Sequence, residues 1–248
     1  MEGPSCENIE DKVSIGKAAN TTMLVELTVT NYNYTAELGN SASEQYKEFE
    51  TQFQEKMNSV LSSNISAVKI LALRDSGTNG VSVKQELLMV ITYTNISIIT
   101  QYEERYWKVV ELLKADPCET DSLCISSQSV SPTMIRPLSE KETCATKIIP
   151  TFIQFFDPVP ATDGLYCMSS CEPKSPQFYD CTVGRCQVQE SGPLCFCPRS
   201  DLYIYTYSRC RGAVLIVAVY GSVGAAIAVL IIILVILGVY IYRRKYYY

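Results

Sequence analysis

Two spacings of apolar residues follow each other between Met23 and Val60. Apolar and polar positions first alternate over 23–30, which predicts a half-buried strand. The apolar positions then recur three or four residues apart, which predicts an amphipathic helix, with Ser43 as a candidate N-cap ahead of Glu44. The alternating set is Val25, Leu27 and Val29, and the helical set is Tyr46, Phe49, Phe53, Met57 and Val60.

The same two spacings return further along the chain. Alternation predicts strands over 67–73 and 81–93, joined by a turn at 75–80 that is rich in residues tolerating positive φ. A helical repeat follows over 100–114, and a weaker strand candidate lies between Cys124 and Ile135. The order strand, helix, strand, strand, helix, strand predicts a ferredoxin-like sandwich, an α+β fold with two helices on one face of an antiparallel sheet.

The segment 136–166 has a less regular pattern. Ile153 to Phe156 is a short strand candidate, and Pro158 and Pro160 indicate a break after it.

An uncharged apolar run extends from Ala213 to Tyr242. It exceeds the ~20 apolar residues that a helix needs to cross a bilayer, and it has no polar face of the kind that a core helix shows. We therefore predict a transmembrane helix over 213–242 and a short cytoplasmic tail over 243–248. Basic residues follow the run and also precede it, so charge alone fixes the orientation only modestly.

The cysteines give a stronger argument for the orientation. Ten of the eleven cysteines lie between Cys118 and Cys210, before the apolar run, and such a framework forms in an oxidising compartment. A zinc site is a poorer explanation because the chain has no histidine and no C-x-x-C pair. We expect the N-terminal side to be extracellular and the protein to lie in the plasma membrane. Four N-glycosylation acceptors agree with this: Asn20, Asn33, Asn64 and Asn95.

The last six cysteines have the spacing of an EGF-like module, C-x9-C-x4-C-x8-C-x-C-x12-C. Six cysteines allow fifteen connectivities, and the spacing alone does not choose among them. Such a module has too little apolar core to fold without its bridges. The six are Cys171, Cys181, Cys186, Cys195, Cys197 and Cys210; the four before them, Cys118, Cys124, Cys144 and Cys167, could form two further bridges, Cys118 with Cys124 and Cys144 with Cys167.

Several segments together resemble the C-terminal region of the intestinal-type transmembrane mucins. They are Tyr166-Cys-Met-Ser-Ser-Cys-Glu-Pro173, Cys181-Thr-Val-Gly-Arg-Cys-Gln187, Ser191-Gly-Pro193, Cys195-Phe-Cys197 and Val219-Tyr-Gly-Ser-Val-Gly-Ala225. The resemblance implies a SEA domain, which we place at 17–136, then a connecting segment at 137–170 and an EGF-like domain at 171–210. It also implies the pairs Cys171 with Cys186, Cys181 with Cys195, and Cys197 with Cys210.

The resemblance further implies a membrane-tethered glycoprotein that protects an apical epithelial surface. The Pro/Thr/Ser repeats that bear O-glycans in that family are not in this sequence. No cleavable signal peptide opens the polar N-terminus. Either the chain is a fragment or the apolar span itself acts as the signal. We expect a fragment because Cys6 is odd and isolated; residues 1–16 would then be the remnant of a preceding EGF-like domain or a linker, with Cys6 as its last cysteine.

Many SEA domains cut themselves at a Gly-Ser bond in the turn between the second and third strands, where the serine hydroxyl attacks the strained carbonyl before it. In this sequence Gly80 is followed by Val81, and Ser82 comes one residue late. Gly77 is followed by Thr78, whose hydroxyl could attack, but the turn is longer than a strained turn should be. We predict no efficient self-cleavage.

The sequence offers no other catalytic chemistry. Without histidine there is no imidazole base, and no phosphate-binding glycine loop or metal motif occurs. We expect a protein that is not an enzyme and has no cofactor or metal, and the net charge of −5 argues against nucleic-acid binding.

The expected partners are the lipid bilayer, a second copy of the chain and an epithelial growth-factor receptor. The receptor belongs to an alternative function, in which the EGF-like module is a ligand or co-receptor in cell-surface signalling. Dimerisation rests on small residues that let helices approach closely, although such residues also occur in monomeric spans. These residues are Ala218, Gly221, Ser222, Gly224, Ala225 and Ala228.

Overall fold

The computed structural model describes residues 10–77, 80–118 and 122–246. The contacts divide them into two compact units. The sandwich unit comprises 12–153 and 157–167, and the disulfide-rich unit comprises 10–11, 154–156 and 168–246.

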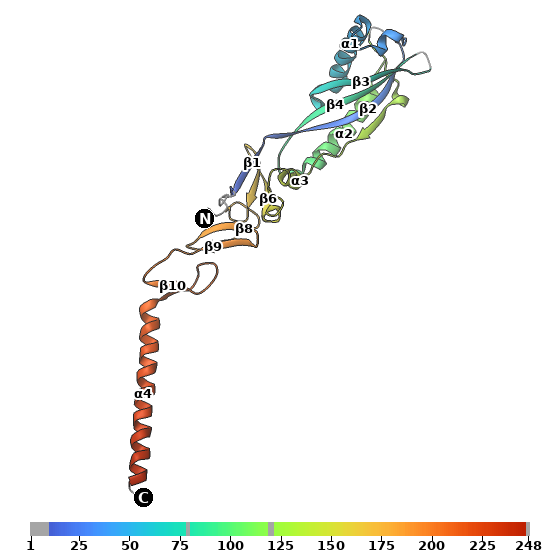
Figure 1. Ribbon diagram of the computed structural model, residues 1–248. Coiled ribbons are helices and arrows are strands. Elements are labelled where there is room, and N and C mark those ends of the chain that lie inside the picture. Colours follow the sequence, from blue (N-terminus) through green and yellow to red (C-terminus); the bar gives the residue numbers. More distant parts are fainter. Residues whose placement is uncertain (1–9, 78–79, 119–121, 247–248) are drawn as a thin grey trace, which may run out of the picture. The chain divides into compact units, whose positions relative to one another are not determined.

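A four-stranded antiparallel sheet forms the centre of the sandwich unit (Figure 1). Its strands lie in the order β3-β4-β2-β5. This order and direction confirm the predicted ferredoxin-like sandwich. The strands are β2 (Ala18–Val29), β3 (Ala67–Asp75), β4 (Val81–Thr92) and β5 (Ser131–Met134), and the two long helices are α1 (Glu44–Leu61) and α2 (Ile98–Ala115).

The core lies between one face of this sheet and the two helices. Alternate residues of β2 and β4 are buried, as the period of a strand with one covered face requires. Phe49, Phe53 and Tyr102 supply the largest buried side chains from the helices. The Tyr102 hydroxyl donates to the Thr22 carbonyl at 3.0 Å and accepts from the Ile135 amide at 3.1 Å. Burial raises the pKa of Tyr102, so the hydroxyl stays neutral and ties α2 to the sheet.

Both long helices begin at a serine cap. Ser43 accepts a hydrogen bond from the Tyr46 amide, which confirms the predicted cap, and Ser97 does the same for the Thr100 amide. The second helix therefore begins two residues before the predicted position. Short 3-10 turns also occur at η1 (Ala36–Gly39), η2 (Ser62–Asn64) and η3 (Ser127–Ser129).

A buried ion pair joins the two helices. Lys56 of α1 lies 2.9 Å from Asp116, the residue that follows α2, and their side chains are only 8% and 7% exposed. Charges as deeply buried as these need a partner, because each one has lost most of its hydration.

The segment after β5 is more regular than its sequence indicates. It forms α3 (Glu140–Ala145), a 3-10 turn η4 (Ile153–Phe155), β6 (Phe156–Ala161) and β7 (Gly164–Ser169), and the last two lie in a sheet of order β1-β7-β6 with β1 (Lys12–Gly16). The strand expected at 153–156 is a 3-10 turn up to Phe155, and the break expected at Pro158 and Pro160 is wrong. Both prolines lie within β6, an edge strand, where a missing N–H is tolerated on the outer side.

Helix α3 contacts the start of α2. A carboxylate oxygen of Glu140 accepts a hydrogen bond from the Ile98 amide at 2.6 Å, one of the amides that a helix leaves without an internal partner. Ser139 and Glu142 form a reciprocal capping box at the start of α3. A hydrogen bond thus joins the segment that contains α3 to the start of α2 in the sandwich unit.

Two small hairpins and a long helix make up most of the disulfide-rich unit. The hairpins pair β8 (Arg185–Gln189) with β9 (Gly192–Phe196) and β10 (Tyr203–Tyr205) with β11 (Ala213–Leu215). Helix α4 (Ile216–Tyr246) has 31 residues and no side chain that is buried in the structure. It begins three residues later than expected because Ala213–Leu215 pair with β10, and it continues through the basic residues of the expected tail.

Candidate functional sites

Three disulfides organise the disulfide-rich unit. The structure bonds Cys171 to Cys186, Cys181 to Cys195, and Cys197 to Cys210. Cys186 and Cys195 lie opposite each other in the β8–β9 hairpin, yet each bonds to a cysteine outside that hairpin. The hairpin is therefore fixed to the preceding loop on both of its strands, in the pairing order that an EGF-like module implies.

Two further disulfides lie in the sandwich unit. Cys118 bonds to Cys124 just after α2, and Cys144 of α3 bonds to Cys167 of β7. Both Cys144 and Cys167 are fully buried, so the second bridge lies inside the packing between α3 and the small sheet. Cys6 lies outside the described residues.

The four glycosylation acceptors all lie in the sandwich unit. Asn20, on the outer face of β2, is exposed, as are Asn33 and Asn95 in loops that precede α1 and α2. Asn64 is half-buried in η2, and its side-chain amide donates to the Leu61 carbonyl at 3.0 Å. Asn64 also lines an open groove of about 590 Å³ beside the exposed ring of Trp107.

Glycosylation at these acceptors remains a prediction, and the expected result is a stepwise change in mass. Thr22→Ala should remove one N-glycan, at Asn20, while leaving that asparagine in place, because the acceptor needs the hydroxyl two positions on. The measurement is gel mobility, before and after enzymatic removal of N-glycans, of the chain expressed in cells behind a signal peptide that directs it into the endoplasmic reticulum. Thr21→Ala, one residue earlier, is the control, and equal mobility of the two variants would contradict the assignment.

The turn between β3 and β4 has an ordinary hairpin geometry at its described residues. The Ser76 amide donates to the Gly80 carbonyl at 3.1 Å, and Val81 pairs directly with Asp75. A side chain at position 80 would place its Cβ 2.6 Å from the Val29 carbonyl oxygen, so a close approach of two backbones explains the glycine. Thr78 lies outside the described residues.

Ser82 is part of strand β4 and lies beyond the turn. Its hydroxyl donates to a Glu26 carboxylate oxygen at 3.2 Å, across the sheet. The non-glycine residues with positive φ in the described chain are Ser62, Thr182 and Cys210, so none of the described residues near this turn has that form of strain.

We therefore expect the chain to remain in one piece. After reduction and denaturation, a chain with a tag at each end should give a single band that carries both tags, because Ser82 is held in a paired strand and its hydroxyl is hydrogen-bonded to Glu26. Two fragments that meet near Gly80 would show that the turn is strained in the folded protein.

An aromatic ring and a basic side chain are stacked in the disulfide-rich unit. The guanidinium of Arg209 lies 4.2 Å from the centre of the Tyr179 ring, and hydrogen bonds from Arg209 and Ser208 lower the pKa of Tyr179. Arg211 lies 3.7 Å from Asp180. Among the described residues, no group of three or more His, Cys, Asp or Glu side chains is arranged to hold a metal ion.

Comparison with known proteins gives the same assignment as the sequence resemblance. Residues 22–115, which run from within β2 to the last residue of α2, match the SEA domain family. Residues 22–115 form a SEA domain. The boundaries 17–136 remain a prediction, and α3, which contacts the start of α2, lies beyond both ranges.

Three curated human proteins are similar over 83% of this chain: Mucin-12 at 29% identity, Mucin-3B at 26% and Mucin-3A at 26%. The chain covers 4%, 2% and 6% of their lengths, respectively. Over most of its length the chain is thus similar to these mucins, in line with the sequence resemblance. Helix α4 is long and apolar enough to cross a membrane, and together with this similarity it supports a single-pass protein of the plasma membrane.

Proposed function

We propose that this chain is the juxtamembrane anchor of a mucin-like glycoprotein that protects an epithelial surface, with its N-terminal side outside the cell. The observation that carries this proposal is the succession of a SEA domain, a disulfide-rich unit and an apolar helix in a chain homologous to mucins. Disulfides and glycosylation acceptors on the N-terminal side of the helix support the orientation.

The test is to fuse a glycan-rich Ser/Thr segment to the N-terminus, behind a signal peptide, and to express it in polarised epithelial cells. We expect the segment to be labelled from the apical medium by a reagent that does not cross membranes, and to stay with the cells. A control that ends at Arg211 lacks α4 and should be released into the medium. Labelling only after permeabilisation would contradict the orientation, and basolateral labelling would contradict the apical assignment.

The alternative function is that of a receptor ligand, in which the EGF-like region binds an epithelial growth-factor receptor. Partly exposed aromatic residues of the disulfide-rich unit, such as Phe178 and Tyr207, would be the contact residues. Saturable binding of soluble 165–211 to such a receptor would favour this function. A loss of surface protection that follows only loss of the whole glycoprotein would favour the anchor.

A second copy of the chain is the proposed partner within the membrane. Leaving aside the neighbouring residues and the helix's own nearby backbone, a Cβ added at Gly221 or Gly224 would meet no atom within 4 Å, so the single helix has room for a larger residue at either position. A larger residue would then act mainly on the close approach of a second helix. We expect Gly221→Ile and Gly224→Ile to lower the signal of a dimerisation reporter in membranes. Gly238→Ile, which is equally open but lies outside the small-residue cluster, is the control. An unchanged signal in all three would refute dimerisation through this surface.

A further inference from the structure

A short ribbon precedes the membrane helix without any intervening linker. In this juxtamembrane hairpin, residues 202–215, Tyr203 pairs with Leu215, Ile204 with Val214 and Tyr205 with Ala213. The amide of Ile216, the first residue of α4, donates to the Leu202 carbonyl at 2.9 Å. Because this bond joins the start of the hairpin to the start of the helix, the hairpin is fixed at that end of α4.

The two faces of the hairpin have different surroundings. Tyr203, Tyr205 and Ala213 line a shallow pocket together with Thr182 and Cys210, so this face lies toward the disulfide-bonded loops. Side chains of a strand alternate between faces, so Ile204 and Val214 lie on the other face. On this other face, Leu202 is 57% exposed, Ile204 53% and Val214 36%. Tyr203 and Leu215, which pair with each other on the first face, are also partly exposed, at 41% and 47%.

A patch of this kind is unusual in water. Two-stranded ribbons are at best marginally stable alone, and clustered exposed apolar side chains mark an interaction surface. The surface here is continuous with α4, whose side chains must themselves contact lipid if the helix spans a bilayer. That continuity favours the bilayer over a protein partner as the occupant.

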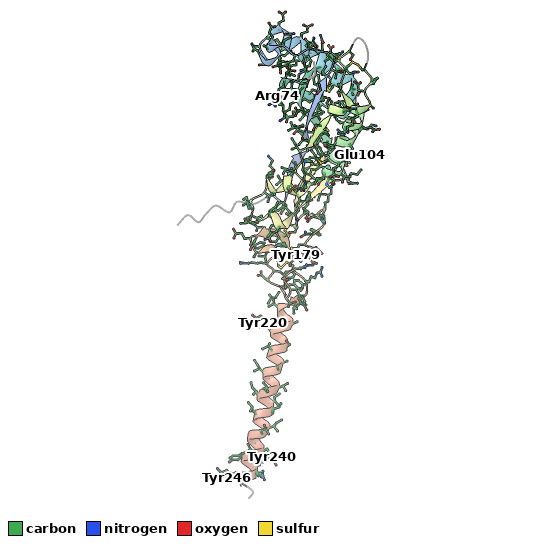
Figure 2. The ribbon with its side chains drawn as sticks, turned by 90° about the vertical axis from the view of Figure 1, so that its right-hand side faces the viewer. Arg74, Glu104, Tyr179, Tyr220, Tyr240 and Tyr246 are labelled. Carbon is green, nitrogen blue, oxygen red and sulfur yellow. A yellow bond between two sulfur atoms is a disulfide. The ribbon has the colours of Figure 1, made fainter. Side chains whose placement is uncertain are left out.

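The tyrosines of α4 indicate where the hairpin lies along the membrane normal. Tyr220 and Tyr240, labelled near the two ends of the helix in Figure 2, are twenty residues apart, which is about 30 Å along a helix axis and matches the hydrocarbon thickness. Tyrosines favour the two interfaces of a membrane. Ile216 then lies about 6 Å beyond the hydrocarbon boundary, within the headgroup zone, and the hairpin begins there.

The basic residues of the hairpin are already engaged by the protein. Arg209 stacks on Tyr179, and Arg211 contacts Asp180 and donates to the Thr182 hydroxyl at 3.2 Å. These contacts within the protein favour apolar burial over anionic headgroups as the main source of attraction to the membrane.

We propose that the juxtamembrane hairpin inserts its Leu202, Ile204 and Val214 side chains into the boundary between headgroups and acyl chains of the bilayer that α4 crosses. The hairpin then holds the disulfide-rich unit at the membrane surface through a second attachment beside the helix. The proposal rests on α4 as a membrane span, which the experiment tests separately.

The experiment measures tryptophan quenching in the full chain, reconstituted in phosphatidylcholine nanodiscs whose acyl chains are brominated near the headgroup. Trp107→Phe removes the one native tryptophan, which is an exposed residue of α2. Ile204→Trp reports on the hairpin, and Leu194→Trp on a similarly exposed apolar position in β9. We expect brominated lipid to lower the Ile204→Trp emission at least twofold and to leave the Leu194→Trp emission unchanged.

Two more variants make the result decisive. Leu230→Trp, near the middle of α4, should be quenched by lipid brominated deep in the acyl chain, which establishes that the helix spans the disc whatever the hairpin does. Leu202→Trp repeats the hairpin measurement if Ile204→Trp misfolds. Misfolding is judged by gel mobility without reductant, which shows whether the disulfides have formed. Unquenched emission at both hairpin positions with a quenched Leu230→Trp would overturn the proposal. Quenching that needs phosphatidylserine and disappears at high salt would also overturn it, because it would show electrostatic binding.

Discussion

Removing the disulfide between Cys181 and Cys195 is expected to unfold the disulfide-rich unit while the SEA domain stays folded. Outside α4, residues 168–215 contain few buried apolar side chains, and two of these, Cys181 and Cys210, are themselves disulfide-bonded. Loss of one native disulfide from such a small unit costs about 2–5 kcal/mol, which is comparable to its whole stability. The SEA domain, by contrast, has a continuous core between its sheet and its two helices.

Hydrogen exchange of the full chain in detergent, read by mass spectrometry, measures both units at once. Cys181→Ala combined with Cys195→Ala should bring the amides of β8 and β9 to the exchange rate of an unfolded chain and leave those of β2 and β4 protected. The matched control replaces Cys118 and Cys124 together with alanine, which removes a bridge from the SEA side and should leave β8 and β9 protected. Retained protection of β8 and β9 in the first variant would mean that packing alone holds the unit.

The sequence predicts the long, periodic elements well because each buries one face against a shared core. The alternation in β2 and β4 and the helical repeats of α1 and α2 are visible without any knowledge of tertiary contacts. The strand order then follows from the succession of elements, since few arrangements of two split β-α-β halves bury both helices.

The elements that were missed depend on partners far away in the sequence. Helix α3 has six residues, too few for a recognisable period, and one of its carboxylates caps α2. Strand β6 contains two prolines and is possible because it lies at a sheet edge. Ala213–Leu215 have the composition of the helix that follows them, and only pairing with β10 shows that they are a strand.

The candidate sites also fall into two groups: some follow from local sequence patterns, and others depend on contacts between residues far apart in the sequence. Acceptor asparagines and the EGF-like cysteine spacing are local patterns, so the sequence alone indicates them. The reason for glycine at position 80 is the nearby Val29 carbonyl, a contact between distant strands. Which apolar side chains of the juxtamembrane hairpin share a face likewise depends on a register that no local pattern specifies.

The sequence does not predict the buried pair of Lys56 and Asp116 either, because one residue lies in α1 and the other follows α2. Breaking this pair should strongly lower the stability of the SEA domain. Asp116→Ala should lower the free energy of unfolding of the SEA domain by about 3–5 kcal/mol, since it leaves the Lys56 ammonium buried without a counter-ion. Replacing both residues, as in Lys56→Met with Asp116→Leu, should recover most of that loss, because neither desolvated charge then remains.

Urea unfolding of the full chain in detergent, followed by the fluorescence of Trp107, measures these differences. The exposed pair of Lys108 and Glu111 on α2, whose side chains are 51% and 68% exposed, provides the control. Glu111→Ala should change the stability by only about 0.5 kcal/mol, because water and salt screen an exposed pair. If Asp116→Ala cost no more than Glu111→Ala, the Lys56 side chain would have to reach solvent in the folded protein, and the pair would stabilise the domain no more than an exposed pair does.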